Sequence, residues 1–142
     1  MHHPSQVSLA LAAVFITLAC VHVFWAFGYG TLGGAAIPTR SDGRPLLRPS
    51  RGATLAVAML LLVAAVVVLG DAGILAPIGP IMLYRVGAWV VGAVLLLRTI
   101  GDFRYVGLFK RERASRFARL DSRIYTPLCA ALAAGTLYVA AA

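Results

Sequence analysis

Charged residues are scarce in this sequence. Only 13% of its 142 residues are Asp, Glu, Lys or Arg, whereas soluble domains carry roughly 25%, and 61% are hydrophobic. A soluble fold of this size needs more polar side chains to cover its surface, and disordered chains are far less hydrophobic. The composition therefore excludes both classes and predicts an integral membrane protein.

Cysteine, histidine and acidic residues are also few. Cys20 and Cys129 lie in apolar stretches without a C-x-x-C motif, which argues against thiol–disulfide chemistry and a structural zinc site. His22 is the one histidine inside an apolar stretch, whereas a b-type haem bundle normally needs two that face each other. The first two apolar stretches hold no acid, unlike small exporters that bind cations on an intramembrane carboxylate. We expect no metal and no cofactor.

Four apolar runs are long enough to cross a bilayer as helices, which takes about 20 residues. They cover residues 7–29, 53–69, 81–101 and 124–142. The expected fold is all-α, a four-transmembrane-helix bundle that forms a single domain over residues 1–142. The sequence allows two starts for the fourth helix. Either Thr126 caps a helix that begins at Pro127, or the helix begins near Asp121 and accommodates the proline.

Basic residues gather in alternate loops. Residues 30–52 and 102–123 together hold eleven Lys and Arg, whereas the N-terminus, the turn at 70–80 and the C-terminus hold none. The positive-inside rule therefore predicts that both loops are cytoplasmic and that both termini lie outside. Arg85, one turn inside the outer end of the third run, is expected to extend to the outer headgroups. The net charge of +8 then indicates topology and attraction to anionic lipid headgroups rather than nucleic-acid binding.

Small residues at four-residue spacing permit close helix packing. The pairs are Ala88 and Gly92 in the third run, and Ala131 and Gly135 in the fourth. Such spacing lets two backbones approach closely. It fits either a tight bundle within one chain or a homodimer face.

His22 is the most unusual residue of the apolar runs. With the N-terminus outside, it lies about two helical turns, or ~10 Å, from the cytoplasmic end of its helix. Trp25 and Tyr29 follow at i+3 and i+7, so the three side chains form one stripe. A buried imidazole can relay protons, contact a ligand or bind a metal. The alternative is a histidine that hydrogen-bonds a backbone carbonyl beside two ordinary interfacial aromatics.

Charged residues at the cytoplasmic ends of the third and fourth runs form a second cluster. Arg98 and Asp102 lie one turn apart and are expected to pair. Arg98 is suited to grip a phosphate or carboxylate. Alternatively, Arg98 extends to the headgroups and Asp121 caps the fourth helix. Because both groups lie at the membrane level of His22, one ligand-binding pocket is allowed, formed by His22, Trp25, Tyr29, Arg98, Asp102, Arg119, Asp121 and Tyr125.

Residues 105–120 predict a basic amphipathic segment in the membrane interface. Val106, Phe109, Phe117 and Leu120 fall near one helical face, and cations occupy most of the rest. Such a segment is attracted to anionic lipid by about 1 kcal/mol per basic residue. Its role is either to recognise headgroups or only to determine topology.

Three blocks of the sequence resemble a known family. They are H-x-x-W-A-x-G in the first run, R-x-x-G-D-F-R-Y-V-G after the third, and F-A-R-L-D-x-R-x-Y-x-P-L-C at the fourth. The family comprises short four-helix bacterial membrane proteins catalogued only as a domain of unknown function. The resemblance covers nearly the whole chain and implies one compact domain in a bacterial plasma membrane, but it supplies no activity.

These observations favour a small membrane protein that binds or moves an amphipathic anion or a lipid headgroup near the cytoplasmic leaflet. One alternative is a membrane-embedded enzyme with His22 as acid/base and Arg98 as the group that stabilises an anion. Another is an accessory subunit of a larger membrane complex, docked through its basic loop.

Overall fold

The structure of the chain, a computed structural model, describes residues 3–28, 37–38, 44–46, 49–76 and 78–142. The helical elements in chain order are α1 (His3–Ala26), α2 (Arg51–Asp71), α3 (Ile81–Ile100), α4 (Arg116–Leu120), the π-helical turn η2 (Asp121–Tyr125) and α5 (Thr126–Ala141). Since α4, η2 and α5 follow one another without a break, four helical segments are long and apolar enough to cross a membrane. The described residues form no strand. The chain is thus a multi-pass, all-α membrane protein, as predicted.

The fourth span begins earlier than either predicted start. Ser115 caps it, because the Ser115 hydroxyl accepts a hydrogen bond from the amide of Ala118 at 3.0 Å. Pro127 has no amide hydrogen and cannot complete the regular ladder. The π-helical turn just before it widens the helix, so that the amide of Thr126 donates to the carbonyl of Asp121. The helix therefore accommodates the proline, and the interpretation of Thr126 as a cap is wrong.

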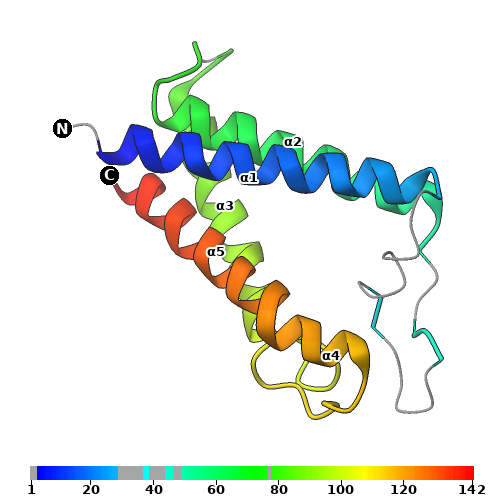
Figure 1. Cartoon of the computed structure of the whole chain (residues 1–142). Helices are drawn as coiled ribbons and strands as arrows, with labels where there is room; N and C mark the ends of the chain where they lie inside the picture. Colours follow the sequence, from blue (N-terminus) through cyan, green and yellow to red (C-terminus); the bar gives the residue numbers. More distant parts are fainter. Residues whose placement is uncertain (1–2, 29–36, 39–43, 47–48, 77) are drawn as a thin grey trace.

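The helices pack as two antiparallel pairs that diverge. Figure 1 shows α1 beside α2, and α3 beside α5, with the two pairs close together near the termini and apart at the other end. A hydrophobic core joins the pairs at the closed end, where Leu11 and Phe15 of α1 meet Val68 of α2 and Val139 of α5. Phe15 and Val68 are fully buried. The core therefore holds one end of the bundle together and leaves the other end open.

Two glycines bring the helices close together within the chain. A Cβ on Gly92 of α3 would lie 2.6 Å from the side chain of Leu137, and one on Gly135 would lie 3.0 Å from that of Leu11. Both positions need a small residue for packing inside the bundle. Of the two interpretations of this spacing, the tight bundle is the one that the contacts fit.

The chain between α3 and α4 is a folded loop rather than the predicted amphipathic helix. Gly101 ends α3 at φ +88° and Gly107 follows at φ +90°, a conformation that favours glycine. The backbone of Gly107 lies against Gly101, and the amide of Leu108 donates to the carbonyl of Thr99 at 2.9 Å. Within residues 105–120 only Arg116–Leu120 is α-helical. The two glycines let the loop fold back on the end of α3, which a continuous helix could not do.

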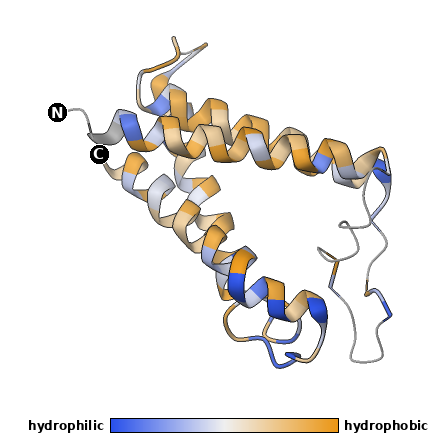
Figure 2. Cartoon of the chain, viewed as in Figure 1, coloured by the Kyte–Doolittle hydropathy of each residue, from blue (hydrophilic) through white to orange (hydrophobic). Residues whose placement is uncertain are grey.

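Polar residues gather at the open end. Figure 2 shows apolar residues along most of the helices and hydrophilic ones in the loop before α4, in α4 itself and at the start of α2, with a further hydrophilic patch near the start of α1. The open end of the bundle is therefore also its basic end.

Candidate functional site

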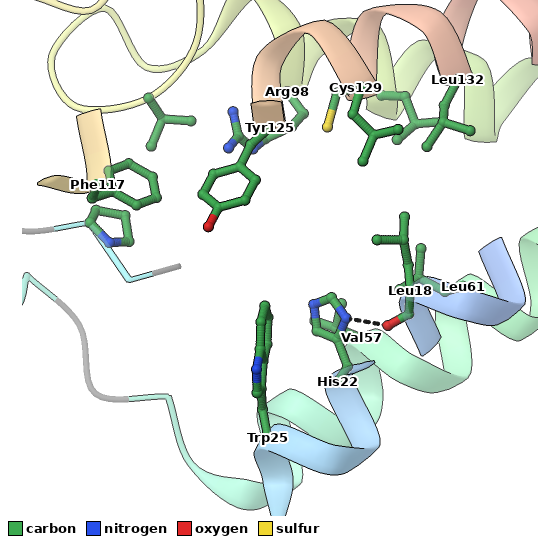
Figure 3. A pocket seen from close by; sticks show the side chains of 14 residues that line it. Leu18, His22, Trp25, Val57, Leu61, Arg98, Phe117, Tyr125, Cys129 and Leu132 are labelled. Carbon is green, nitrogen blue, oxygen red and sulfur yellow. Dashed lines mark hydrogen bonds between the residues drawn. The ribbon is translucent and has the colours of Figure 1, made fainter. Parts of the chain in front are cut away.

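A cavity of about 410 Å³ lies between the diverging helix pairs. Most of its lining is apolar, with Leu18 and Leu61 on the α1–α2 side and Leu132 on the α5 side. Figure 3 shows His22 and Trp25 projecting from α1 into the cavity. Arg98 and Tyr125 line the opposite wall, which the α3–α5 pair forms. Four of the eight predicted site residues thus line one cavity, and Asp121 is not among the lining residues.

His22 uses one ring nitrogen for the scaffold. Its Nδ1 lies 2.7 Å from the carbonyl oxygen of Leu18, one turn earlier in α1. The ring also lies against Trp25, with 5.2 Å between the centroids and 59° between the planes. The backbone hydrogen bond that the alternative interpretation predicted is therefore present. It occupies only Nδ1, and the other nitrogen, Nε2, faces the cavity (Figure 3).

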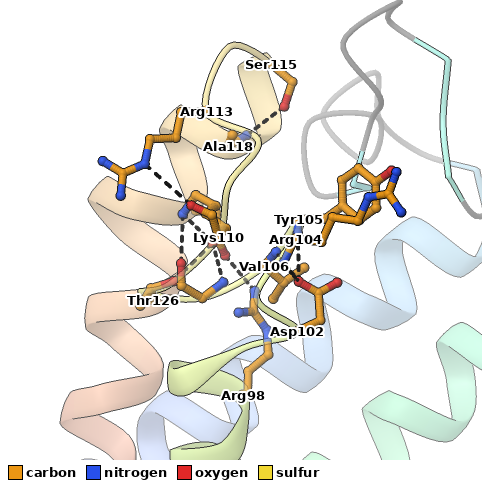
Figure 4. Close-up of polar contacts among 12 residues, drawn as sticks. Arg98, Asp102, Arg104, Tyr105, Val106, Lys110, Arg113, Ser115, Ala118 and Thr126 are labelled. Carbon is orange, nitrogen blue, oxygen red and sulfur yellow. Dashed lines mark hydrogen bonds and ion pairs between the residues drawn. The ribbon is translucent and has the colours of Figure 1, made fainter.

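Arg98 pairs with Asp121 instead of Asp102. Its Nη2 donates to Oδ1 of Asp121 at 2.7 Å, and the Asp121 side chain is fully buried. The other oxygen, Oδ2, accepts from Nζ of Lys110 at 2.8 Å, from the amide of Gly107 at 3.0 Å and from the hydroxyl of Thr126 at 3.1 Å. Figure 4 shows three of these partners, Arg98, Lys110 and Thr126, close together where the loop meets the fourth span. Asp121 therefore ties α3, the loop and the fourth span together.

The cluster of Arg98, Lys110 and Asp121 carries an excess positive charge. It has two cations for one carboxylate. Nη1 of Arg98 is buried, and no hydrogen-bond partner for it exists among the described residues. The Arg98 side chain as a whole is 32% exposed, but a nitrogen that is itself buried loses water as a partner and gains from an acceptor in the protein or in a ligand. This donor is therefore available to a further acceptor.

Asp102 lies outside the cavity and makes a local turn. Its Oδ1 accepts from the amides of Arg104, Tyr105 and Val106 at 2.9, 2.7 and 2.9 Å. Desolvation raises the pKa of Asp102, but these amide hydrogen bonds outweigh it and hold the pKa below its ordinary value. The predicted Arg98–Asp102 pair is wrong because α3 ends at Ile100, so that the spacing of one helical turn no longer applies.

The remaining predicted residues differ in position. Arg119 is exposed and donates to the carbonyl of Ala114 at 2.7 Å, away from the cavity lining. Tyr29 falls outside the described residues. Arg85 pairs with the buried side chain of Asp71 at 3.2 Å, whereas we expected it to extend to the headgroups.

Lys110 is the residue of the charged cluster that sequence reasoning missed. We grouped it with the lipid-facing cations, yet it is 3% exposed and contacts Asp121. One signal was present in the sequence, since Lys110 is the only lysine among thirteen basic residues. A lysine presents a compact charge that fits a narrow buried site, where the guanidinium group of arginine is broader.

The described residues contain no group of three or more His, Cys, Asp or Glu that could hold a metal ion. The cavity instead offers one guanidinium, one imidazole, one phenol and one indole in an apolar setting. Such a set can bind an acidic headgroup and cover an apolar chain or ring.

No curated protein and no solved structure matches the sequence. A protein-family model described as "Protein of unknown function (DUF3995)" matches residues 15–136, a range that contains the cavity residues His22, Arg98 and Tyr125. The chain therefore belongs to the DUF3995 family.

Proposed function

We propose that this membrane protein binds an amphipathic anion in the cavity between its helix pairs. The acidic headgroup lies at Arg98, and the apolar body lies against the leucines of the lining. The single observation that carries the proposal is the unpartnered Nη1 of Arg98, in a cluster with excess positive charge at the wall of an apolar cavity.

The arrangement of the cations supports binding at Arg98. A guanidinium has five N–H donors, so it can contact a phosphate or carboxylate while it holds a second acceptor. Arg98 holds Asp121 through Nη2, so Nη1 can contact a ligand without breaking that pair. Lys110 also neutralises Asp121, so a small movement of Arg98 toward a ligand does not leave a bare buried carboxylate.

The charge pattern supports a position near the cytoplasmic leaflet. The cavity lies at the end of the bundle where the basic loop after α3 packs. We place this end inside and both termini outside, in the plasma membrane of a bacterium, because cytoplasmic loops carry the excess of Lys and Arg.

The loop after α3 provides a contact with lipid beside the cavity. Phe103 and Phe109 stack with 6.1 Å between their centroids, and both are exposed, as is Leu108. Arg104 and Arg111 are exposed in the same loop. Apolar side chains that enter the headgroup region beside cations are typical of binding to anionic lipid. Anionic lipid therefore lies within reach of the open end.

Fluorescence of Trp25 tests the proposed binding. The chain has two tryptophans, and Trp89→Phe leaves only Trp25, which lines the cavity. The protein in phosphatidylcholine nanodiscs is titrated with dodecyl phosphate, with empty nanodiscs to correct for partitioning. We expect a saturable change in emission that dodecyl maltoside, a neutral amphiphile of equal chain length, does not produce.

Arg98→Gln and Arg85→Gln form the matched pair for this titration. Both remove one arginine from α3, but Arg85 pairs with Asp71 away from the cavity. Loss of a hydrogen bond to a charged group costs about 1.5–3 kcal/mol, so Arg98→Gln should weaken binding roughly tenfold or more, and Arg85→Gln should not. Equal affinities in the two variants, or equal responses to the phosphate and the maltoside, would contradict the proposal.

A further inference from the structure

We infer that anion binding in this cavity is coupled to the uptake of one proton at Nε2 of His22. The inference rests on the proposed function and specifies how the same site recognises its ligand. It follows from the geometry of the two imidazole nitrogens and from the groups that surround them.

The hydrogen bond to Leu18 determines which nitrogen carries the hydrogen. A backbone carbonyl can only accept, so Nδ1 must donate across the 2.7 Å that separates it from the Leu18 oxygen. In the neutral ring the hydrogen therefore resides on Nδ1, and Nε2 is left as an acceptor with a lone pair. A donor on both nitrogens exists only in the imidazolium form.

Nε2 faces the space where we place the ligand. No hydrogen bond from Nε2 to another described residue is present, and the ring projects into the cavity (Figure 3). A lone pair that faces an anion makes no hydrogen bond and repels it, whereas an N–H donor carrying a positive charge attracts it. An anion in this cavity therefore stabilises the imidazolium form of His22.

The other groups around the cavity do not supply this proton near neutral pH. Arg98 faces it from α3 and remains charged throughout. Tyr125 of η2 and Cys129 of α5 face it as well, and phenols and thiols ordinarily titrate at about pH 10 and 8.5. The α2 side presents only the apolar Val57 and Leu61. Among the described residues that line the cavity, only His22 has a side-chain type that titrates between pH 5 and 8.

The coupling makes anion binding tighter at lower pH. Binding is strongest at a pH at which the imidazole is already protonated. As the pH rises above that range, each bound anion must bring one proton with it, so affinity falls by about tenfold per pH unit. Without the coupling, a ligand of constant charge would bind equally across this range.

The test uses dodecanesulfonate, because its sulfonate group keeps one negative charge over the whole pH range. Its affinity for the Trp89→Phe protein in phosphatidylcholine nanodiscs is measured at intervals between about pH 5 and 8. We expect a weakening that approaches tenfold per pH unit at the alkaline end. In weakly buffered solution near neutral pH, addition of dodecanesulfonate to the same protein should raise the pH of the solution, since protons are taken up.

Two substitutions separate the nitrogens of His22. Glutamine can present its amide near the position of Nε2, whereas asparagine presents its amide near Nδ1 and can keep the contact with Leu18. We expect His22→Gln to bind dodecanesulfonate with no dependence on pH, and His22→Asn to bind at least tenfold more weakly than wild type at the acidic end. Cys129→Ser, which removes the thiol from the lining, should keep the wild-type pH dependence.

The outcomes distinguish this inference from the proposed function. Saturable binding that does not change with pH, or a pH dependence that persists in His22→Gln, overturns the proton coupling and leaves the anion site in place. No binding of dodecanesulfonate at any pH overturns both. Proton uptake by the wild-type protein decides the question even if a His22 variant does not fold.

Discussion

The two ends of the bundle each contain one buried aspartate, and they balance its charge differently. At the closed end, Asp71 of α2 pairs with Arg85 of α3 at 3.2 Å. At the open end, Asp121 pairs with both Arg98 and Lys110. Both carboxylate side chains are fully buried, yet one cluster is neutral and the other carries an excess positive charge.

The unpartnered atoms differ in the same way. Within the two aspartate clusters, the buried atom without a hydrogen-bond partner among the described residues is an acceptor at the closed end, Oδ2 of Asp71, and a donor at the open end, Nη1 of Arg98. Arg98, which carries this donor, also lines the apolar cavity. We therefore base the proposed site on the excess of one charge beside a cavity and not on a buried ion pair alone.

The largest effect should come from removing the carboxylate at the open end. Asp121→Asn leaves two cations without a counter-charge, so we expect a loss of about 3–5 kcal/mol in the free energy of unfolding. Asp71→Asn should cost less, because the Arg85 side chain is 47% exposed and can reach the headgroups. Unfolding of both variants in the same detergent measures the difference. Equal losses would show that the two clusters do not differ as described.

Lys110 and Arg111 test whether the loop cations are equivalent. Lys110 is buried against Asp121, and its neighbour Arg111 is exposed. Lys110→Gln should therefore reduce stability by about 1.5–3 kcal/mol, the range for a hydrogen bond to a charged group, whereas Arg111→Gln should stay within about 0.5 kcal/mol. Arg111→Gln should instead weaken binding of the protein's loop surface to anionic lipid. A larger loss of stability in Arg111→Gln than in Lys110→Gln would indicate that Lys110 is one of the lipid-facing cations.

A pair of double-mutant cycles distinguishes the two acids that could serve Arg98. We expect Arg98→Gln to be strongly non-additive with Asp121→Asn, since these side chains touch. With Asp102→Asn it should be additive to within about 0.5 kcal/mol. Coupling to Asp102 as large as that to Asp121 would contradict the observed pairing.

The smallest effect concerns acid stability and Asp102. Its pKa lies below the ordinary value in the folded chain, so its carboxylate stabilises the fold at neutral pH and loses this contribution as the pH falls through the folded pKa. Because the side chain is exposed, solvent screening keeps the contribution small. Asp102→Asn should slightly flatten the acid limb of a stability–pH curve and leave binding of dodecyl phosphate unchanged. Weakened binding in this variant would show that Asp102 belongs to the site.

Span length and hydropathy were sufficient to predict the four helices, because a membrane helix is determined by a property summed over about 20 residues. The start of the fourth span was not predictable in this way. The mixture of charged and apolar side chains in residues 116–120 predicts a separate interfacial segment, yet these residues belong to the fourth span, because Ser115 caps it and a π-helical turn accommodates Pro127.

The candidate site was predictable only in part. His22 and Trp25 face the cavity together because they share one helix face, and that spacing is visible in the sequence. The partner of Arg98 was not visible in the sequence, because the choice between Asp102 and Asp121 depends on where α3 ends. Gly101, a frequent helix stop, was the available signal that Asp102 lies beyond the helix.

The central claim is that the open end binds an anion through Arg98, and native mass spectrometry of the detergent-extracted protein tests it most directly. Wild type and Arg85→Gln should both retain a bound acidic amphiphile as a discrete mass increase, and Arg98→Gln should lose it. The same bound mass in all three proteins, or only neutral lipid on each of them, would contradict the claim.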